Sequence, residues 1–253
     1  MADHIQVQVQ DRVLTIRMNR PEKKNALTRQ MYTSMTAALH QAEADAAVRT
    51  VLITGSADCF TAGNDLQDFA NASPGEPAVA LEYLKTLAAT RKPVLAAVAG
   101  PAVGIGTTML LHCDLVYASS SARFQLPFVN LGLCPEAGSS LILPALMGHH
   151  RAAELLFFGE LFSANVARQL GIVNQVLSEQ ELLQSATAKA QQLAQKPPSA
   201  LRATKALLKQ NNRAIADAMD SESKQFAALL QGPEAQEAFA AFLERRKPDF
   251  SNF

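Results

Sequence analysis

Two short segments in the first half of the chain consist almost entirely of apolar residues, and a segment with helical spacing lies between them. The two apolar segments are residues 50–54 and 94–98. Strands that are covered on both faces show this pattern, because neither face contacts water. The segment between them, residues 78–91, carries leucines at helical spacing. Strands that alternate with helices in this way predict an α/β domain.

The N-terminal region shows both periodicities in succession. In residues 5–18, apolar and polar residues alternate around Gln10 and Asp11, which predicts a β-hairpin. In residues 28–44 the spacing changes to that of a helix with one apolar face. Together with the strands above, these segments assign residues 1–175 to the α/β domain.

The remaining residues, 176–253, have the pattern of helices only. Pairs of helix-breaking residues separate four segments with helical spacing. The predicted helices are residues 179–195, 199–210, 215–231 and 234–246. They are rich in Ala, Leu and Phe although they follow a complete α/β domain, so we expect them to mediate self-association.

Charge and cysteine content exclude several classes of protein. The chain has 23 Lys and Arg against 23 Asp and Glu, so it lacks the basic field of nucleic-acid-binding proteins. Its three cysteines are widely spaced and no CxxC or HxxxH pair occurs, so we expect neither a disulfide framework nor a metal site. No apolar run approaches the roughly 20 residues of a membrane span, and the first residues do not resemble a secretory signal. We therefore expect a cytoplasmic protein with no membrane or nucleic-acid partner.

Three segments place small residues where a predicted strand gives way to a helix. They are residues 60–66, 100–106 and 135–138. Small residues permit unusual backbone angles and let a ligand approach backbone N–H groups closely. The first N–H groups of a helix suit a developing oxyanion, because they are unpaired and lie at the positive end of the helix dipole. Taken alone, each segment is equally well explained as an ordinary turn.

Common nucleotide-binding and hydrolase motifs are absent from these segments. Gly104 and Gly106 are followed by Thr107 without the later glycine of a dinucleotide fingerprint. The Gly-Lys-Ser or Gly-Lys-Thr sequence that ends a P-loop does not follow any glycine here. The GxSxG elbow of serine hydrolases does not occur. The ligand is therefore expected to belong to another class.

Six segments, in order along the chain, resemble motifs of the crotonase (enoyl-CoA hydratase/isomerase) family. They are residues 19–27 (NRPEKKNAL), 60–66 (FTAGNDL), 97–104 (AVAGPAVG), 113–119 (CDLVYAS), 164–173 (ANVARQLGIV) and 238–250 (AFAAFLERRKPDF). The resemblance implies the crotonase fold, a spiral of repeated ββα units in residues 1–175, followed by a helical trimerisation region in residues 176–253. It also implies an acyl-CoA substrate, no cofactor besides the coenzyme A of that substrate, and a homotrimer or a dimer of trimers.

The same motifs imply which residues bind the substrate. By position, the backbone N–H groups of Ala62 and Ile105 are implied to receive the thioester oxygen. Loss of one such donor typically costs about 2.7–4 kcal/mol of transition-state stabilisation. The residues implied to bind the rest of the substrate are Lys24, Ala26, Leu27, Gly63, Asn64, Asp65, Leu66, Gly104, Thr108 and Phe128.

The carboxylates of the site indicate the reaction. Hydratases of the family use two glutamates to activate water, and Thr108 and Phe128 occupy those positions here. Glu136 stands where many hydratases have glycine, which resembles the peroxisomal-type Δ3,Δ2-enoyl-CoA isomerases. One carboxylate suffices for isomerisation, because it removes the C2 proton to give a dienolate and then delivers a proton to C4. Burial against apolar groups such as Phe128 would raise the pKa of Glu136 towards neutrality.

The sequence leaves alternatives open for the site and for the reaction. Glu136 and Asp65 also suit the caps of the helices that follow them, and His112 on an apolar helix is more often a hydrogen-bonded core residue. Other crotonase reactions, such as hydration, dehalogenation or thioester hydrolysis, use the same oxyanion site. A non-catalytic acyl-CoA-binding protein is a further alternative.

Overall fold

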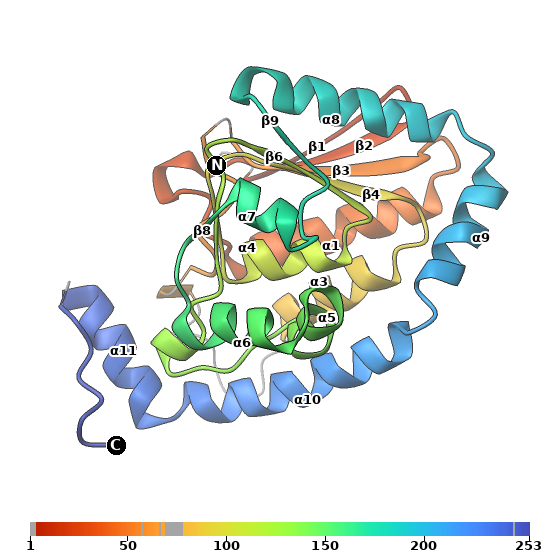
Figure 1. The fold of residues 1–253 in the computed structure, drawn as a ribbon. Helices are drawn as coiled ribbons and strands as arrows, with labels where there is room; N and C mark the ends of the chain where they lie inside the picture. Colours follow the sequence, from red (N-terminus) through yellow and green to blue (C-terminus); the bar gives the residue numbers. More distant parts are fainter. Residues whose placement is uncertain (1–3, 57, 66, 69–77, 245) are drawn as a thin grey trace.

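A six-stranded sheet forms the centre of the computed structural model, which describes residues 4–56, 58–65, 67–68, 78–244 and 246–253. The strand order is β1-β2-β3-β4-β6-β9, with β1 and β2 antiparallel and the other neighbours parallel (Figure 1). The strands are β1 (Ile5–Gln10), β2 (Val13–Met18), β3 (Thr50–Thr54), β4 (Val94–Val98), β6 (Leu115–Ser119) and β9 (Gln175–Leu177). The prediction of an α/β fold is confirmed.

The predicted N-terminal hairpin is also confirmed, with its turn one residue later than expected. Gln10 and Val13 are the last pair of β1 and β2. Asp11 and Arg12 form the turn, with φ values of 49° and 66°. Two-residue turns with positive φ match the twist of the flanking strands.

Every residue of β3 and β4 is buried, as their continuous apolar patterns predict. Leu52 and Leu95 pack with α8 (Glu179–Ala194) on one face of the sheet. Ile53 and Ala96 belong to the larger core on the other face, together with α1 (Arg29–Ala44) and α3 (Val79–Ala89). Figure 1 shows α8 above the sheet and α1 below it. Helices therefore cover both faces.

A three-stranded sheet lies beyond the carboxyl ends of β4 and β6. Its strands, in order, are β5 (Pro101–Val103), β7 (Arg123–Gln125) and β8 (Phe162–Ser163). β4 is followed by β5 and α4 (Ile105–Thr108), and β6 is followed by β7 and α5 (Ser139–Met147). This recurrence of two strands and a helix agrees with the predicted ββα units.

Four C-terminal helices follow the sheet, as predicted. Besides α8 they are α9 (Pro198–Leu208), α10 (Asn212–Leu230) and α11 (Pro233–Glu244). α8 packs on the sheet, whereas α10 runs past α3 and α5 to α11 (Figure 1). The predicted division after residue 175 falls within β9, and α8 shares the core of the sheet. The role of these helices in self-association stays a prediction.

Short helices complete the connections. They are η1 (Pro21–Lys23), η2 (Met109–His112), η3 (Val129–Leu131), α6 (His149–Phe158) and α7 (Ala164–Gln169). Across the part of the chain that the structure describes, no helix combines the length and apolar character needed to cross a membrane.

Candidate active site

Asn25 joins the first motif segment to the loop after β3. Asn25 is fully buried and has a φ of 53°. Its Nδ2 donates to Cys59 O at 2.9 Å and to Phe60 O at 3.1 Å, and its Oδ1 accepts from Arg20 N at 2.7 Å. These bonds hold residues 19–27 against the second motif segment.

The backbone N–H of Ala62 is engaged within the protein. It donates to Lys24 O at 2.9 Å. A donor used in this way does not reach a substrate oxygen, so the prediction of Ala62 as an oxyanion donor is wrong. The physical reason is the pairing of two loops that lie far apart in the sequence, which a motif does not reveal.

The segment that contains Ala62 runs parallel to residues 101–105. Thr61 pairs with Ala102 in a parallel bridge, and this register brings Asn64 to the level of Ile105. Within the described residues, the N–H groups of Asn64 and Ile105 contact no acceptor. Two unpaired donors at the ends of neighbouring segments suit the negative oxygen of a thioester enolate.

Close packing of these two segments requires glycine at position 63. Gly63 has a φ of 93°, and a Cβ added there would lie 2.9 Å from Val103 O. Gly104 has a φ of 54°, but no atom lies within 4 Å of an added Cβ. At Gly63 steric contact adds to the backbone preference for glycine, whereas at Gly104 only the backbone angle favours it.

Glu136 lies in the loop between η3 and α5 and is half-buried. Thr108, at the end of α4, donates a weak hydrogen bond from Oγ1 to Glu136 Oε1 at 3.4 Å. Burial, which is the larger cause, and the charge of Glu222 together raise the pKa of Glu136 to about 7, while the hydrogen bond from Thr108 opposes the shift. A carboxyl group with this pKa can both accept and release a proton near neutral pH.

The backbone around Glu136 is held from two sides. Ala137 has a φ of 65°, which is uncommon for a residue with a side chain. Ser139 Oγ donates to Glu136 O at 2.5 Å. Burial lowers the pKa of His112 to about 4, so its neutral ring donates from Nε2 to Ala137 O at 2.8 Å. His112 is thus a hydrogen-bonded core residue, as expected, and it supports the loop that carries Glu136.

Glu222 in α10 contacts the same loop and was not predicted as a site residue. Only 7% of its surface is exposed. Its Oε2 accepts from Gly138 N at 2.5 Å, and its Oε1 accepts from Ser140 N at 2.9 Å. No local sequence pattern indicates this contact, because Glu222 and Gly138 are 84 residues apart.

Tyr32 in α1 is a second site residue that sequence analysis missed. Its hydroxyl donates to Asn64 Oδ1, and its ring centre lies 5.8 Å from that of Tyr83. Burial raises the pKa of Tyr32, and the charge of Glu136 contributes to the increase. The hydroxyl is therefore protonated at neutral pH. The helical spacing of residues 28–44 predicted the helix but did not single out this position.

Asp65 caps the residues that follow it. Its Oδ1 accepts from Gln67 N and Asp68 N, both at 3.1 Å. Its Oδ2 accepts from Arg20 Nη1 at 2.6 Å. Burial alone would raise the pKa of Asp65, but the bond and charge of Arg20 and the backbone bonds from Asp68 and Gln67 together outweigh burial, so the pKa is lowered. The capping alternative therefore describes Asp65 better than substrate binding. Leu66, which was also predicted to bind the substrate, lies outside the described residues.

The other predicted binding residues line the same loops or lie beneath them. Leu27 is buried and donates from its backbone N to Gly63 O at 2.8 Å. Lys24 is exposed, Ala26 is half-buried and Phe128 is buried in the core. Their contact with coenzyme A or the acyl chain stays a prediction.

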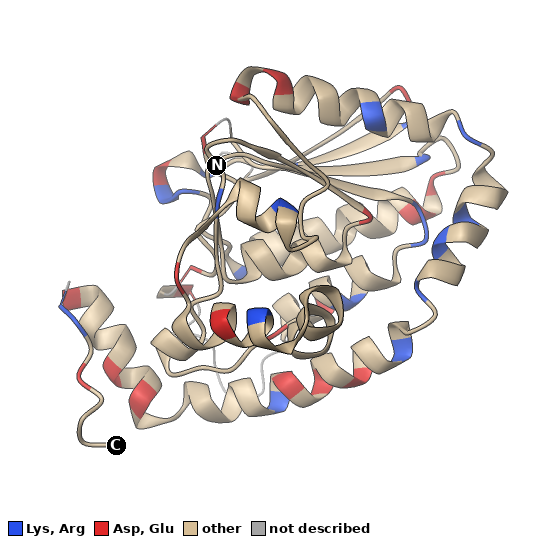
Figure 2. Ribbon diagram, in the orientation of Figure 1, with Lys and Arg blue, Asp and Glu red and all other residues tan. Residues whose placement is uncertain are grey.

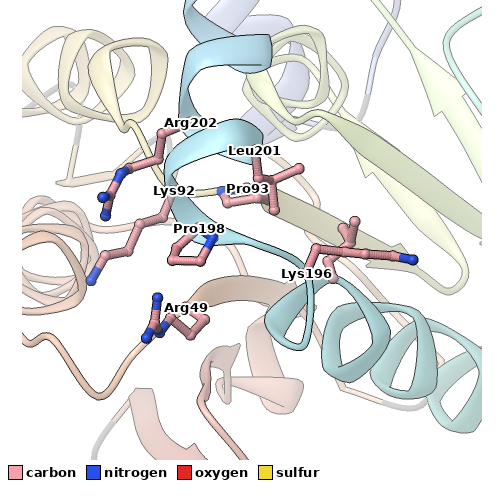
Figure 3. A pocket seen from close by; sticks show the side chains of 8 residues that line it. Arg49, Lys92, Pro93, Lys196, Pro198, Leu201 and Arg202 are labelled. Carbon is pink, nitrogen blue, oxygen red and sulfur yellow. The ribbon is translucent and has the colours of Figure 1, made fainter.

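A basic depression lies at the other end of the sheet, where β3 and β4 begin. Its lining includes Arg49, Lys92, Lys196 and Arg202, and Figure 3 shows Lys92 and Lys196 pointing away from each other. Its enclosed volume of about 10 Å³ accommodates no more than one water molecule. This depression is too small for an acyl-CoA.

A larger cavity of about 340 Å³ opens between α5 and α10, beside the loop of Glu136. Its lining includes Cys134, Ser140 and Glu222. The cavity therefore reaches the supporting carboxylate of Glu222 from the side of α10. Over the described residues, no group of three His, Cys, Asp or Glu side chains is arranged to hold a metal ion.

Comparison with known proteins identifies the family. The enoyl-CoA hydratase/isomerase family matches residues 8–252. The crystal structure of an enoyl-CoA hydratase/isomerase from Pseudoalteromonas atlantica T6c superposes with a TM-score of 0.94 at 41% identity, covering 98% of this chain and 100% of that one.

Two curated relatives carry the names of different reactions. Enoyl-CoA delta isomerase 2 of Rattus norvegicus is 40% identical over 217 residues, which are 83% of this chain and 55% of the relative. The chain thus spans about half the length of that relative. The 2,3-dehydroadipyl-CoA hydratase of Escherichia coli (strain K12) is 35% identical over 247 residues, which are 95% and 96% of the two chains. By the family match, the fold and the identities, the chain belongs to the crotonase family of enoyl-CoA hydratases and isomerases.

Proposed function

We propose that the protein is a Δ3,Δ2-enoyl-CoA isomerase of fatty acid degradation, with Glu136 as its acid and base. The observation that carries the proposal is the contact of Glu136, whose carboxyl group has a pKa raised to about 7, with Thr108, which lies one turn of α4 from an N–H group that contacts no acceptor among the described residues. Thr108, which contacts Glu136, and Ile105, which supplies that N–H, are the two ends of α4.

In the proposed mechanism, the N–H groups of Asn64 and Ile105 bind the thioester oxygen of a 3-enoyl-CoA. Their bonds strengthen as negative charge develops on that oxygen. Ionised Glu136 removes a proton from C2, and the electrons shift to form a dienolate. Protonated Glu136 then delivers the proton to C4, which gives the 2-enoyl-CoA and restores the carboxylate. No water is consumed.

Hydration is the second candidate, because the Escherichia coli relative is named as a hydratase. Activation of water in this family requires a second acidic group in the pocket. Thr108 and Phe128, which occupy the hydratase positions, are not bases at neutral pH. Glu222 is buried near Glu136, but each of its oxygens already accepts a backbone N–H. This arrangement favours isomerisation.

Coenzyme A is proposed to bind along Lys24, Ala26 and Leu27, with the thioester end at Asn64 and Ile105. The exposed side chain of Lys24 is accessible to a phosphate group. A trimer, or a pair of trimers, is proposed because C-terminal helices expose large apolar side chains. Among these residues are Leu207, Leu208, Phe242 and Leu243.

Assays of the purified protein with 3-enoyl-CoA and with 2-enoyl-CoA test the proposed reaction. We expect efficient conversion of the first to the second and poor hydration of the second. Efficient hydration would make the protein a hydratase. Binding of both thioesters without turnover would make it a non-catalytic acyl-CoA-binding protein.

A further inference from the structure

One face of α10 packs directly on the loop that carries Glu136. This face comprises Ile215, Met219 and Glu222, which follow one another at helical spacing. A Cβ added to Gly138 would lie 3.0 Å from Ile215 Cγ2 and 3.3 Å from Ile215 O. Glycine at position 138 therefore lets α10 approach the loop closely enough for Glu222 to reach it.

Glu222 supplies the cap that the loop itself lacks. Gly138 is the residue before the first turn of α5 and has no side chain to accept a hydrogen bond. The two oxygens of Glu222 accept the N–H groups of Gly138 and Ser140 instead. Its backbone carbonyl also accepts from Cys134 Sγ at 3.8 Å, so α10 contacts the loop on both sides of Glu136.

Glu222 differs from the other acidic residues of its helix. Figure 2 shows several acidic positions along α10. Asp217 and Asp220 are exposed, and Asp220 pairs with Lys85. Glu222 is buried and contacts no cation within the described residues. A buried carboxylate of this kind is costly unless its hydrogen bonds are strong, which points to a specific role.

We propose that Glu222 is a positioning residue for Glu136: its carboxylate fixes the loop that carries Glu136 and places a second negative charge beside the acid/base group. The proposal rests on the proposed isomerase function of Glu136. It assigns to α10, a helix outside the predicted α/β domain, control over both the geometry and the proton affinity of the active site.

Groups from four elements face Glu136. Thr108 of α4 donates to its carboxylate, Tyr32 of α1 contributes a protonated hydroxyl, and Cys134 lies in the same loop. His112 of η2 is neutral and contacts only the backbone of the loop. Among the described residues, Glu222 of α10 is thus the charged group that faces Glu136, and its charge adds to the effect of burial on the pKa of Glu136.

Two substitutions separate the charge of Glu222 from its reach. Glu222→Gln keeps the length and one of the two acceptor oxygens but removes the charge, so the pKa of Glu136 should fall by about one unit. Glu222→Asp keeps the charge but does not span both N–H groups. It should leave the pKa of Glu136 near its wild-type value and lower kcat about tenfold to a hundredfold through a displaced base. Asp217→Asn, an exposed carboxylate on the same helix, is the matched control and should change neither quantity.

The pKa of Glu136 is measured by infrared titration of its protonated carboxyl band, assigned from the difference between wild type and Glu136→Gln. The pH dependence of kcat/KM for 3-enoyl-CoA is measured on the same proteins. An unshifted pKa in Glu222→Gln, or a wild-type kcat in Glu222→Asp, would overturn the proposal. If Glu222→Gln does not fold, the kcat of Glu222→Asp decides the positioning role alone.

The infrared titration needs no substrate, which separates this proposal from the proposed function. A shifted pKa in a protein without isomerase activity would support the role of Glu222 beside Glu136 and reject the isomerase assignment. Normal isomerase activity with an unshifted pKa and a wild-type kcat in both variants would reject the role of Glu222 and keep the isomerase assignment.

Discussion

The hydroxyl group of Tyr32 in α1 donates a hydrogen bond to Oδ1 of Asn64, whose backbone N–H contacts no acceptor among the described residues. This bond ties the loop of the proposed oxyanion site to a buried helix. Tyr32→Phe removes it, and a bond of this kind typically contributes about 1 kcal/mol. We expect kcat/KM for 3-enoyl-CoA to fall about fivefold to tenfold, measured by steady-state kinetics.

Tyr83→Phe is the matched control for Tyr32→Phe. Tyr83 is also buried and lies next to Tyr32, but in the part of the chain that the structure describes its hydroxyl contacts only Met109 Sδ, at 3.7 Å. Its replacement should leave kcat/KM near the wild-type value. Equal losses in the two variants would show that packing of the aromatic pair, rather than the bond to Asn64, supports the site.

Glu136→Gln should lower the conversion of 3-enoyl-CoA to 2-enoyl-CoA by several orders of magnitude, because it removes the base and keeps the size of the side chain. Affinity for the product should change little, since the proposed oxyanion donors are backbone groups. Equilibrium binding and single-turnover kinetics measure the two effects. Glu154→Gln, an exposed position in α6, is the control. Near-normal isomerisation by Glu136→Gln would require another base in the pocket.

The raised pKa of Glu136 also predicts how stability depends on pH. The folded protein binds the proton of Glu136 with a pKa of about 7, against an ordinary value of 4.5. This preference stabilises the fold fully below pH 4.5 and is lost as the pH rises through 7. Above that pH, Glu136→Gln should be more stable than wild type, by up to about 3 kcal/mol. Denaturant unfolding at pH 5 and pH 8 measures the difference, and equal pH dependence in both proteins would contradict it.

Much of the fold could be predicted because burial leaves a direct pattern in the sequence. β3 and β4 are buried at every position, and their boundaries match the apolar segments from which they were predicted. The helices that follow residue 178 begin and end close to breakers such as Pro197 and Gly232. Periodicity does not indicate which element packs on which. The position of α8 on the sheet was therefore not predicted, nor was that of α10 beside the loop of Glu136.

Only those parts of the proposed site that lie within sequence motifs could be predicted. The proposed roles of Glu136 and Ile105 follow from motifs whose residues stand in order along the chain. The choice between Ala62 and Asn64 as a donor depends on which N–H is already paired, and that is decided by the contact of Ala62 with Lys24. The role proposed for Glu222 depends on a contact with Gly138 across 84 residues of chain, and therefore on tertiary packing.

The exposed apolar residues of the C-terminal helices predict self-association. Leu207, Leu208, Phe242 and Leu243 each expose more than half of their surface, and Leu208 exposes 82%. Exposed apolar groups of this kind often mark interaction surfaces. Light scattering at micromolar concentration should detect a trimer or a pair of trimers, and Leu208→Glu should weaken the assembly. A stable monomer would contradict the prediction.

The contact between Gly63 and Val103 predicts different effects for two glycine substitutions. In Gly63→Val, the new side chain meets Val103 O at 2.9 Å from its Cβ and forces a φ of 93° on a β-branched residue. The parallel segments must then separate, which displaces the N–H of Asn64 from that of Ile105. We expect loss of turnover and a loss of stability of about 3 kcal/mol or more.

Gly104→Ala is the comparison for Gly63→Val, because its Cβ enters open space and only the φ of 54° opposes it. It should cost about 1–3 kcal/mol of stability and leave the two segments paired. Thermal unfolding and turnover of 3-enoyl-CoA, measured on both variants, distinguish the contributions. If Gly63→Val retains turnover while Gly104→Ala loses it, the spacing between the two segments does not position the oxyanion donors. The proposed mechanism would then need a donor other than the N–H of Asn64.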